Sequence, residues 1–273
     1  MARYVVAVSG GVDSIVLLDM LSQVPGNDII VAHFDHGIRS DSAQDAAFVK
    51  ELADTHGFIF ETKREELGEG ASEELARARR YEFLNEVALK HSARVMTAHH
   101  ADDAVESIAI NLHRGTGWRG LAVLDSAVVR PLLHLSKAEL HTYAQKRALT
   151  WREDSTNASD VYLRNRLRAK TAQLPDDHKL QLLALRHHQI DSRRSIDKEV
   201  SRLIGPGPSY SRYFFTHIPK NVAIECLRFV TNAQLTRPQL ERVLLAIKTA
   251  ATGSTFQAGS GINLSFTTRN FSL

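Results

Sequence analysis

The sequence predicts an α/β protein with a doubly wound parallel sheet, followed by a small, mainly helical C-terminal domain. Three observations support this prediction. Short apolar runs alternate with helical segments in the first part of the chain, which is typical of parallel sheets covered by helices. The first run ends in a glycine turn that leads into a helix. Residues 205–208, Gly-Pro-Gly-Pro, then break the chain, so we expect domains at 1–205 and 206–273, the first ending in a linker helix.

The elements follow from the apolar patterns and from residues that begin or end helices. Ser72 is expected to cap one helix, and Ser136 with Glu139 forms a capping box for another. Glycines in the last 20 residues predict a small hairpin. Strands are expected at residues 3–9, 28–34, 59–62 and 94–98. Helices are expected at 13–21, 40–56, 72–91, 162–174, 176–204, 218–230 and 236–249, with one more between the fourth strand and Arg114 and another that begins at Ser136.

Composition excludes several classes of protein. Hydrophobic residues make up 43% of the 273 residues, which is ordinary for a protein with a real core. No run approaches the length of about 18 apolar residues that a membrane span needs, and we expect no secretory signal because the chain starts directly in a strand. Cys226, the single cysteine, cannot form an internal disulfide or a Cys-x-x-Cys site, and we expect it in the core. The sequence therefore predicts a cytoplasmic protein.

The first strand runs into Ser9-Gly10-Gly11-Val12-Asp13-Ser14. Two glycines let the backbone approach a ligand closely, and the start of the following helix favours a phosphate or pyrophosphate. Ser9 and Ser14 can add hydroxyl donors. Asp13 disfavours a bare phosphate, so we expect a divalent cation to bridge it to the anion. The structural alternative is an ordinary strand-to-helix turn capped by Ser and Asp.

Acidic side chains gather at the start of the helix that follows the fourth strand. Asp103 and Glu106 are three residues apart, and Asp102 and Glu106 are four apart, so the carboxylates share a helix face. Such a cluster favours a cationic ligand, either a metal or an ammonium group. Charge stabilisation of the helix N-terminus is the alternative. His99 and His100 lie at the same end and could contact a nucleotide or substrate.

Basic residues are clustered although the net charge is only +3 and the isoelectric point about 9.0. Such arrays can neutralise phosphates, although solvated helix faces give the same pattern. Arginine is better suited than lysine to hold a phosphate, because its planar group can bind two oxygens at once. The clusters are Arg77, Arg79 and Arg80; Arg164, Arg166, Arg168 and Lys170; and Arg186, Arg193 and Arg194, with Arg114 before a Gly-Thr-Gly turn.

Taken together, these motifs resemble the tRNA(Ile)-lysidine synthetase family. The first motif is shared by all ATP pyrophosphatases, the PP-loop superfamily with an adenine nucleotide alpha hydrolase-like fold. The His-His-Ala-Asp-Asp, Asp-Ser-Thr-Asn and Arg-Asn-x-x-Arg motifs are more specific to the family. The matching segments come in the family's order and lie at residues 9–14, 33–39, 77–81, 99–106, 114–117, 130–133, 153–157 and 164–168.

The resemblance implies a reaction and its participants. ATP, with Mg²⁺, would adenylate C2 of the wobble cytidine in the CAU anticodon of tRNA(Ile) and release pyrophosphate. L-lysine would then displace AMP and form lysidine, which changes decoding from AUG to AUA. By motif, the implied ATP-binding residues are Ser9, Gly10, Gly11, Val12, Asp13, Ser14 and His99, with Asp13 near Mg²⁺; the implied catalytic residues are Asp13, Arg80, Asp103, Glu106 and Arg114, of which Asp103 and Glu106 would hold lysine.

The expected partners are therefore tRNA(Ile), lysine and ATP, and no membrane. We expect the basic helices from Arg164 to Arg194 and the domain at 206–273 to bind the tRNA. A homodimer is one of the assemblies that the sequence allows. Another ATP pyrophosphatase is a second hypothesis, although thiolases of this kind generally use cysteine pairs and amidating enzymes an ammonia-supplying partner. A non-catalytic RNA-binding protein is a third, and the intact Asp13, Asp103 and Glu106 argue against it.

Overall fold

The structure is a computed structural model that describes residues 2–37, 42–68, 72–152 and 163–273. It contains two compact units, Met1–His187 and His188–Leu273. The junction falls inside helix α7 (Asp176–Ile204), which has no glycine or proline to interrupt it. The predicted domain boundary at residues 205–206 coincides with the end of α7, whereas the boundary between the two compact units lies inside this helix, at residues 187–188.

The N-terminal unit is built on a parallel sheet with the strand order β3-β2-β1-β4. The predicted α/β fold with a parallel sheet is confirmed. Because β2 lies on one side of β1 and β4 on the other, the direction of the crossovers reverses at β1, and ligands bind outside the carboxyl ends of strands at such a point. The strands are β1 (Ala2–Ala7), β2 (Asn27–Asp35), β3 (Ile59–Arg64) and β4 (Arg94–Met96).

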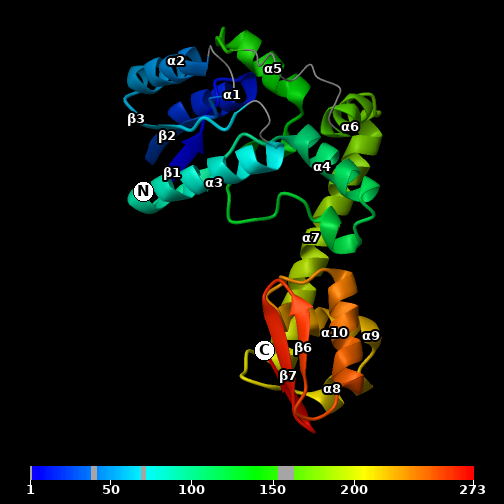
Figure 1. The fold of residues 1–273 in the computed structure, drawn as a ribbon. Helices are drawn as coiled ribbons and strands as arrows, with labels where there is room; N and C mark the ends of the chain where they lie inside the picture. The colour runs from blue at the N-terminus through cyan, green and yellow to red at the C-terminus, as the bar shows by residue number, and fades with distance from the viewer. Residues whose placement is uncertain (1, 38–41, 69–71, 153–162) are drawn as a thin grey trace. The chain divides into compact units, whose positions relative to one another are not determined.

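Helices cover both faces of this sheet, as Figure 1 shows. Neighbouring side chains of a strand point to opposite faces, so Val5 packs with Phe83 of α3 and Val6 packs with Leu17 of α1. The helix α3 (Glu73–Lys90) therefore covers one face, and the other is covered by α1 (Val12–Ser22), α2 (Ser42–Thr55) and α5 (Lys137–Lys146).

Two predicted caps are confirmed. The Ser72 hydroxyl accepts a hydrogen bond from the Leu75 amide at 3.1 Å. Ser136 and Glu139 form the capping box, since the Glu139 carboxylate accepts from the Ser136 amide at 2.7 Å. The remaining elements of this unit are α4 (Ala101–His113), α6 (Leu163–Ala172) and the 3₁₀ helices η1 (Trp118–Leu121) and η2 (Pro131–His134).

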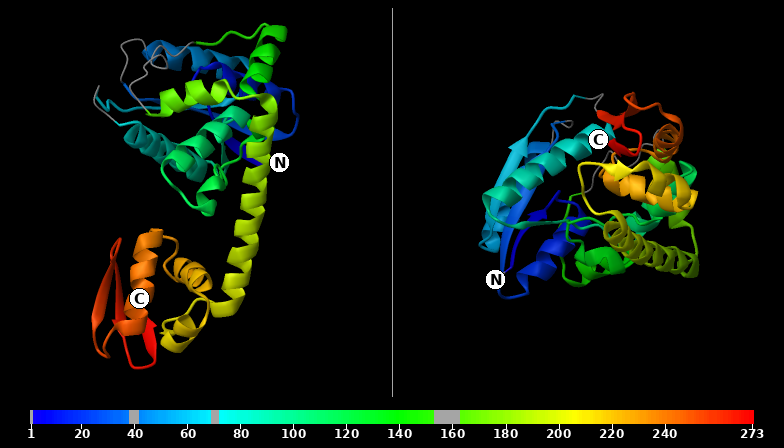
Figure 2. Two further views of the ribbon diagram at one scale, coloured as in Figure 1. Left: turned by 90° about the vertical axis from the view of Figure 1, so that its right-hand side faces the viewer. Right: turned by 90° about the horizontal axis from the view of Figure 1, so that it is seen from below.

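The C-terminal unit combines three helices with an antiparallel sheet (Figure 2). The predicted hairpin is present as β6 and β7, but two further strands extend it in the order β5-β8-β7-β6, because Tyr210 pairs with Phe271 far along the chain. The elements are β5 (Tyr210–Ser211), α8 (Arg212–His217), α9 (Lys220–Val230), α10 (Arg237–Thr249), β6 (Thr255–Gly259), β7 (Ile262–Phe266) and β8 (Asn270–Ser272).

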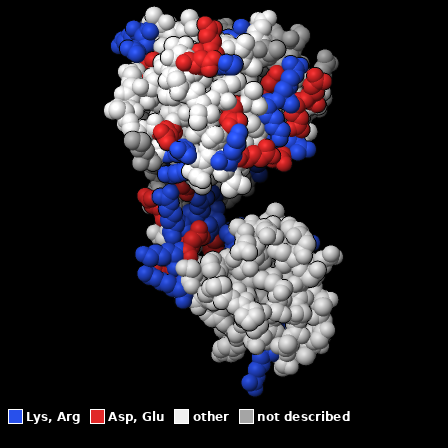
Figure 3. All heavy atoms as spheres, turned by 90° about the vertical axis from the view of Figure 1, so that its left-hand side faces the viewer, with Lys and Arg blue, Asp and Glu red and all other residues white. Residues whose placement is uncertain are grey.

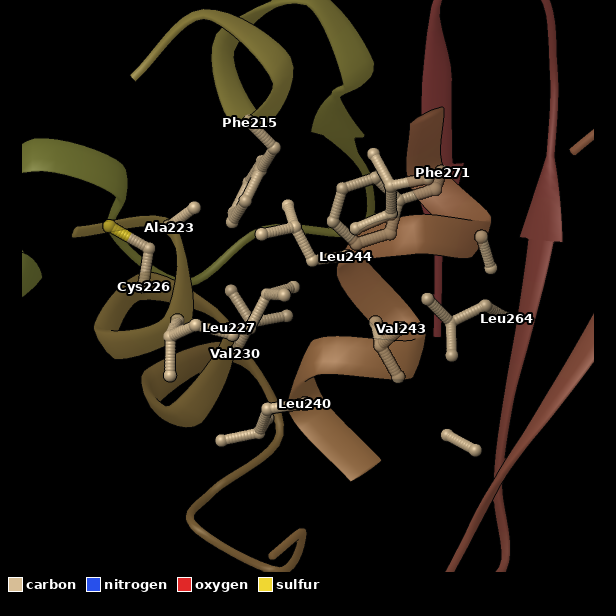
Figure 4. Close-up of a cluster of buried hydrophobic side chains, with 14 of the residues drawn as sticks. Phe215, Ala223, Cys226, Leu227, Val230, Leu240, Val243, Leu244, Leu264 and Phe271 are labelled. Atoms are coloured by element: carbon tan, nitrogen blue, oxygen red, sulfur yellow. The ribbon is translucent and has the colours of Figure 1, made fainter. Parts of the chain in front are cut away.

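The C-terminal unit has its own hydrophobic core. Figure 4 shows Phe215, Leu227, Leu244 and Phe271 converging from α8, α9, α10 and β8. Cys226 is fully buried there, as predicted, and its burial raises the pKa of the thiol to about 11. Throughout the described ranges, no helix combines the length and apolar character that a membrane crossing requires.

Candidate functional site

The candidate site lies where the first turns of α1 and α4 meet. These helices follow β1 and β4, which are neighbours in the sheet. Asp13 is in the first turn of α1, and His100 is the N-cap residue of α4; their Oδ2 and Nε2 atoms are 3.7 Å apart. Two helix N-termini, each carrying partial positive charge, therefore lie close together at the switch point of the sheet, and this arrangement favours an anion.

The glycine loop is held in one shape by its own side chains. Gly10 has a φ of +92°, a value that L residues with side chains rarely adopt. The Ser14 hydroxyl donates to the Gly11 carbonyl at 2.9 Å and accepts from the Ser9 amide at 3.2 Å. The Arg152 amide donates to the Gly10 carbonyl at 3.0 Å. Because the first amides of a helix lack partners within it, those at the start of α1 remain available to a phosphate.

Asp13 has an oxygen that fits a cation. Its Oδ1 atom is buried and has no hydrogen-bond partner among the described residues. Mg²⁺ is usually bound by one or two carboxylates together with substrate phosphates and water. The described part of the chain offers no group of three or more His, Cys, Asp or Glu side chains that could hold a metal ion. The residues present therefore fit a cation that arrives with a phosphate, and Asp13 is the residue that would hold it.

Asp102 is a structural tie between three helices. Its Oδ2 atom accepts the Lys137 amide of α5 at 2.8 Å, and its Oδ1 atom accepts the Lys179 ammonium group of α7 at 3.1 Å. Burial acts to raise the pKa of this carboxyl, but the bonds from Lys137 and Lys179 outweigh it and hold the pKa below its ordinary value. Asp102 is thus compensated by the protein itself and is the least suited of the three acids to bind a ligand.

Asp103 and Glu106 lie in the same first turns of α4. The Asp103 carboxylate accepts the His100 amide at 2.9 Å and lies 3.5 Å from His100 Nε2. Glu106 is 3% exposed, and its Oε2 atom accepts a hydrogen bond from Arg168 Nε of α6 at 2.9 Å. The sequence predicted the shared face of these carboxylates, but neither interpretation of the Arg164–Lys170 cluster, phosphate neutralisation or a solvated helix face, predicted that Arg168 pairs with Glu106. Their mutual repulsion is therefore partly balanced by an arginine 62 residues along the chain.

His100 is the histidine that contacts the acidic groups. It is 4% exposed, and its Nε2 atom faces both Asp13 and Asp103. The Nδ1 atom of His99, which the resemblance assigns to the ATP site, lies 2.7 Å from the Thr97 hydroxyl, and its role stays a prediction. The side chains at the N-cap and N3 positions of a helix lie close together. The spacing of His100 and Asp103 therefore already indicated that these two residues are in contact.

The predicted arginines differ in their surroundings. The Arg77 and Arg80 guanidinium groups lie 5.0 and 5.7 Å from the centre of the Tyr81 ring in α3. Arg114 is exposed at the C-terminal end of α4, so a helix rise of 1.5 Å per residue puts it about 16 Å along the axis from Asp103. The structure does not bring Arg114 next to Asp103 and Glu106, and its role stays a prediction.

Arg186 belongs to the protein interior. It is 5% exposed and donates to the Val123 carbonyl at 2.8 Å, so its place in a phosphate-binding cluster is wrong. Figure 3 shows that Lys and Arg lie interspersed with Asp and Glu over the visible face of the N-terminal unit. The motif at 153–157 lies outside the described residues, and so do the side chains of Arg164 and Asn165.

The fold, the glycine loop and the helix N-termini define an α/β nucleotide-binding domain. A family model described as a PP-loop domain matches residues 1–174, and the chain belongs to this family. This membership supports an ATP-binding PP-loop, which in this chain is the glycine loop at 9–14. A U34-tRNA thiolase, NcsA from Methanococcus maripaludis, solved with its [4Fe-4S] cluster, has a similar fold. Its TM-score is 0.56 at 18% identity, over 69% of this chain and 70% of that one.

Relatives within the family carry a more particular name. The tRNA(Ile)-lysidine synthase of Solibacter usitatus is 40% identical over 173 residues, which are 61% of this chain and 39% of that protein. The tRNA(Ile)-lysidine synthase of Thermus thermophilus is 42% identical over 172 residues, 60% of this chain and 34% of that protein. The chain thus matches between a third and two fifths of the length of these relatives.

Proposed function

We propose that this protein uses ATP to attach L-lysine to C2 of the wobble cytidine in the CAU anticodon of tRNA(Ile). The reaction releases pyrophosphate and AMP, and its product, lysidine, changes decoding from AUG to AUA. One observation carries the proposal: His100 Nε2 lies 3.7 Å from Asp13 of the PP-loop and 3.5 Å from Asp103, which shares the first turns of α4 with Glu106. These two carboxylates suit an amine substrate, and the chain is about 40% identical over this region to proteins named tRNA(Ile)-lysidine synthase.

Each group in the proposed site has a distinct task. The amides at the start of α1 and the hydroxyls of Ser9 and Ser14 hold the phosphates of ATP. Asp13 holds Mg²⁺, which when bound offsets the charge of the phosphates. Asp103 and Glu106 hold the ammonium groups of lysine. Arg80 of α3 steadies the adenylated cytidine.

A sulfur-transferring activity is less well supported. The chain has one cysteine, Cys226, and it lies in the hydrophobic core of the C-terminal unit. Because its burial raises the pKa to about 11, the thiol stays protonated near neutral pH and is a poor nucleophile. An amidating enzyme would use ammonia and would have no need of carboxylates to hold an amino acid.

Transfer of labelled lysine to RNA tests the proposal. The full chain is incubated with an unmodified tRNA(Ile) transcript with a CAU anticodon, labelled lysine and Mg²⁺, with and without ATP. We expect label that depends on ATP, remains on the RNA after the protein is removed, and disappears when the wobble cytidine is changed. Release of pyrophosphate without lysine transfer would retain the PP-loop chemistry and reject lysine as the nucleophile.

A further inference from the structure

The charge of the chain is unevenly distributed. Residues 200–273 contain eight Lys and Arg but only two Asp and Glu, whereas the whole chain has 34 and 31. Both acids in this range have a basic neighbour: Glu225 lies 3.6 Å from Arg228, and Glu241 lies 3.3 Å from Lys220. No acidic residue occurs from 242 to 273. A surface of this charge suits a polyanion.

One aromatic pair stands on the surface of this basic unit. Tyr213 of α8 is 71% exposed, and its ring is stacked on that of His217, with centroids 3.9 Å apart and planes inclined by 23°. His217 Nδ1 lies 2.8 Å from the Tyr213 carbonyl oxygen and 2.9 Å from the Thr216 hydroxyl. These contacts fix the His217 ring, so the pair is preorganised and one ring faces solvent.

Basic residues lie on the segments that contact Arg212, the residue before Tyr213. Arg212, next to Tyr213, donates to the carbonyls of Ile247 and Ala250 at 2.8 and 2.7 Å, which joins the start of α8 to the end of α10. Lys248 is exposed between these two acceptors. The Arg212 amide donates to the Arg269 carbonyl at 2.9 Å, which brings exposed Arg269 to the same edge. Two solvent-exposed cations thus lie on the segments that Arg212 joins to the start of α8, the helix that carries the aromatic stack.

We propose that Tyr213 and His217 form a stacking platform for an unpaired base of RNA, with Lys248 and Arg269 contacting the flanking phosphates. Proteins recognise RNA mainly at unpaired bases that stack on aromatic side chains, while cations follow the backbone. The charge excess favours RNA over a protein partner. The proposal deepens the proposed function, on which the identity of the RNA as tRNA rests.

RNA affinity of the full chain tests the platform. Fluorescence anisotropy measures the Kd for two labelled probes, a short single-stranded RNA and the CAU tRNA(Ile) transcript, at fixed salt and without ATP or lysine. Loss of one base stack corresponds to about 5- to 150-fold weaker binding, and we expect this for Tyr213→Ala. Tyr213→Phe keeps the ring and should bind within about twofold of the unchanged protein.

Matched variants separate stacking from general effects. Leu89→Ala removes another exposed apolar side chain, 84% exposed on α3, and should leave the affinity unchanged. Arg269→Gln should lower the slope of log K against log salt by about one, since one phosphate contact is lost. When the single-stranded RNA carries 5-iodouracil, photocrosslinking should join this base to Tyr213 or His217.

Several outcomes would overturn the platform: Tyr213→Ala binding both RNAs as the unchanged protein does, or Tyr213→Phe binding as weakly as Tyr213→Ala. If Tyr213→Ala unfolds at a lower temperature than the unchanged protein, His217→Ala replaces it, because His217 is also exposed. Unchanged RNA affinity of His217→Ala would then overturn the platform. The two proposals fail separately. If Tyr213→Ala binds RNA weakly but the unchanged protein does not transfer lysine, the platform is kept and the reaction is rejected. If the unchanged protein transfers lysine but Tyr213→Ala binds RNA normally, the reaction is kept and the platform is rejected.

Discussion

The partners of individual carboxylates decide which of them can serve a ligand. Three acids share the first turns of α4, yet their surroundings differ. Asp102 is held by Lys137 and Lys179, and Glu106 by Arg168. Asp103 instead faces His100, whose ring also approaches Asp13 of the PP-loop. His100 therefore connects Asp13 of the PP-loop with Asp103, one of the two carboxylates proposed to bind the lysine substrate.

Asp103→Asn tests the lysine site. The amide oxygen can still accept the His100 amide, so the helix cap is kept while the charge is removed. A hydrogen bond to a charged group contributes about 1.5–3 kcal/mol. We therefore expect KM for lysine to rise about 10- to 100-fold, with ATP affinity within about twofold. Asp102→Asn is the control and should change KM for lysine little. A normal KM for lysine in Asp103→Asn would remove Asp103 from the site.

Asp102 also predicts a pH dependence of stability. Because the folded protein holds the pKa of Asp102 below its ordinary value of 3.8, the ionised carboxylate stabilises the fold fully above pH 3.8. This contribution is lost as the pH falls through the lower folded value. Thermal unfolding should show Asp102→Asn less stable than the unchanged protein at pH 7, with the difference shrinking below pH 3.8. A difference that grows on acidification contradicts this account.

At the scale of elements, the site depends on the turn between β1 and α1. The turn directs the start of α1 toward the carboxyl edge of the sheet, and α4 arrives there from β4. Only a residue that tolerates positive φ allows this path without strain, and Gly10 provides it. The loop is further held by Ser14 and by the Arg152 amide, so its shape does not depend on a bound ligand.

Replacing Gly10 separates backbone strain from phosphate binding. Gly10→Ala and Gly26→Ala both introduce a side chain at positive φ, +92° and +87°, and each should cost about 1–2 kcal/mol of stability. Gly26 lies in the turn before β2, at the opposite edge of the sheet from the PP-loop. We expect KM for ATP in pyrophosphate release to rise about tenfold or more only in Gly10→Ala, because relief of the strain at its positive φ shifts the backbone amides of the phosphate loop. Equal KM values in the two variants would show that the loop does not hold ATP.

At the scale of the whole molecule, each unit has a separate core. Clusters of apolar residues cover both faces of the parallel sheet in the first unit, and another fills the C-terminal unit. Val200, Ile196 and Ile204 of α7 belong to the C-terminal core. Lys179 and Arg186, earlier in the same helix, bind residues of the first unit.

A truncation tests how these units divide the work. A chain that ends at His187 keeps Lys179 and Arg186, whereas one that ends at Gly205 leaves Val200, Ile196 and Ile204 without their apolar partners. We expect the 1–187 protein to unfold cooperatively and to bind ATP as the full chain does, measured by calorimetry. Its affinity for the CAU tRNA should fall at least about tenfold, with a shallower salt dependence, because the basic unit is absent. Unchanged tRNA affinity would assign RNA binding to the first unit.

The sequence by itself determined the features that depend on neighbours along the chain. The alternation of strands and helices, the caps at Ser72 and Ser136, the PP-loop and the buried Cys226 follow from local pattern and chemistry. The tertiary structure alone decided that Arg168 pairs with Glu106, that Lys179 neutralises Asp102 and that β5 pairs with β8. Such contacts join residues many positions apart, and the period of a helix or strand holds no information about which distant side chain the packed fold brings to it.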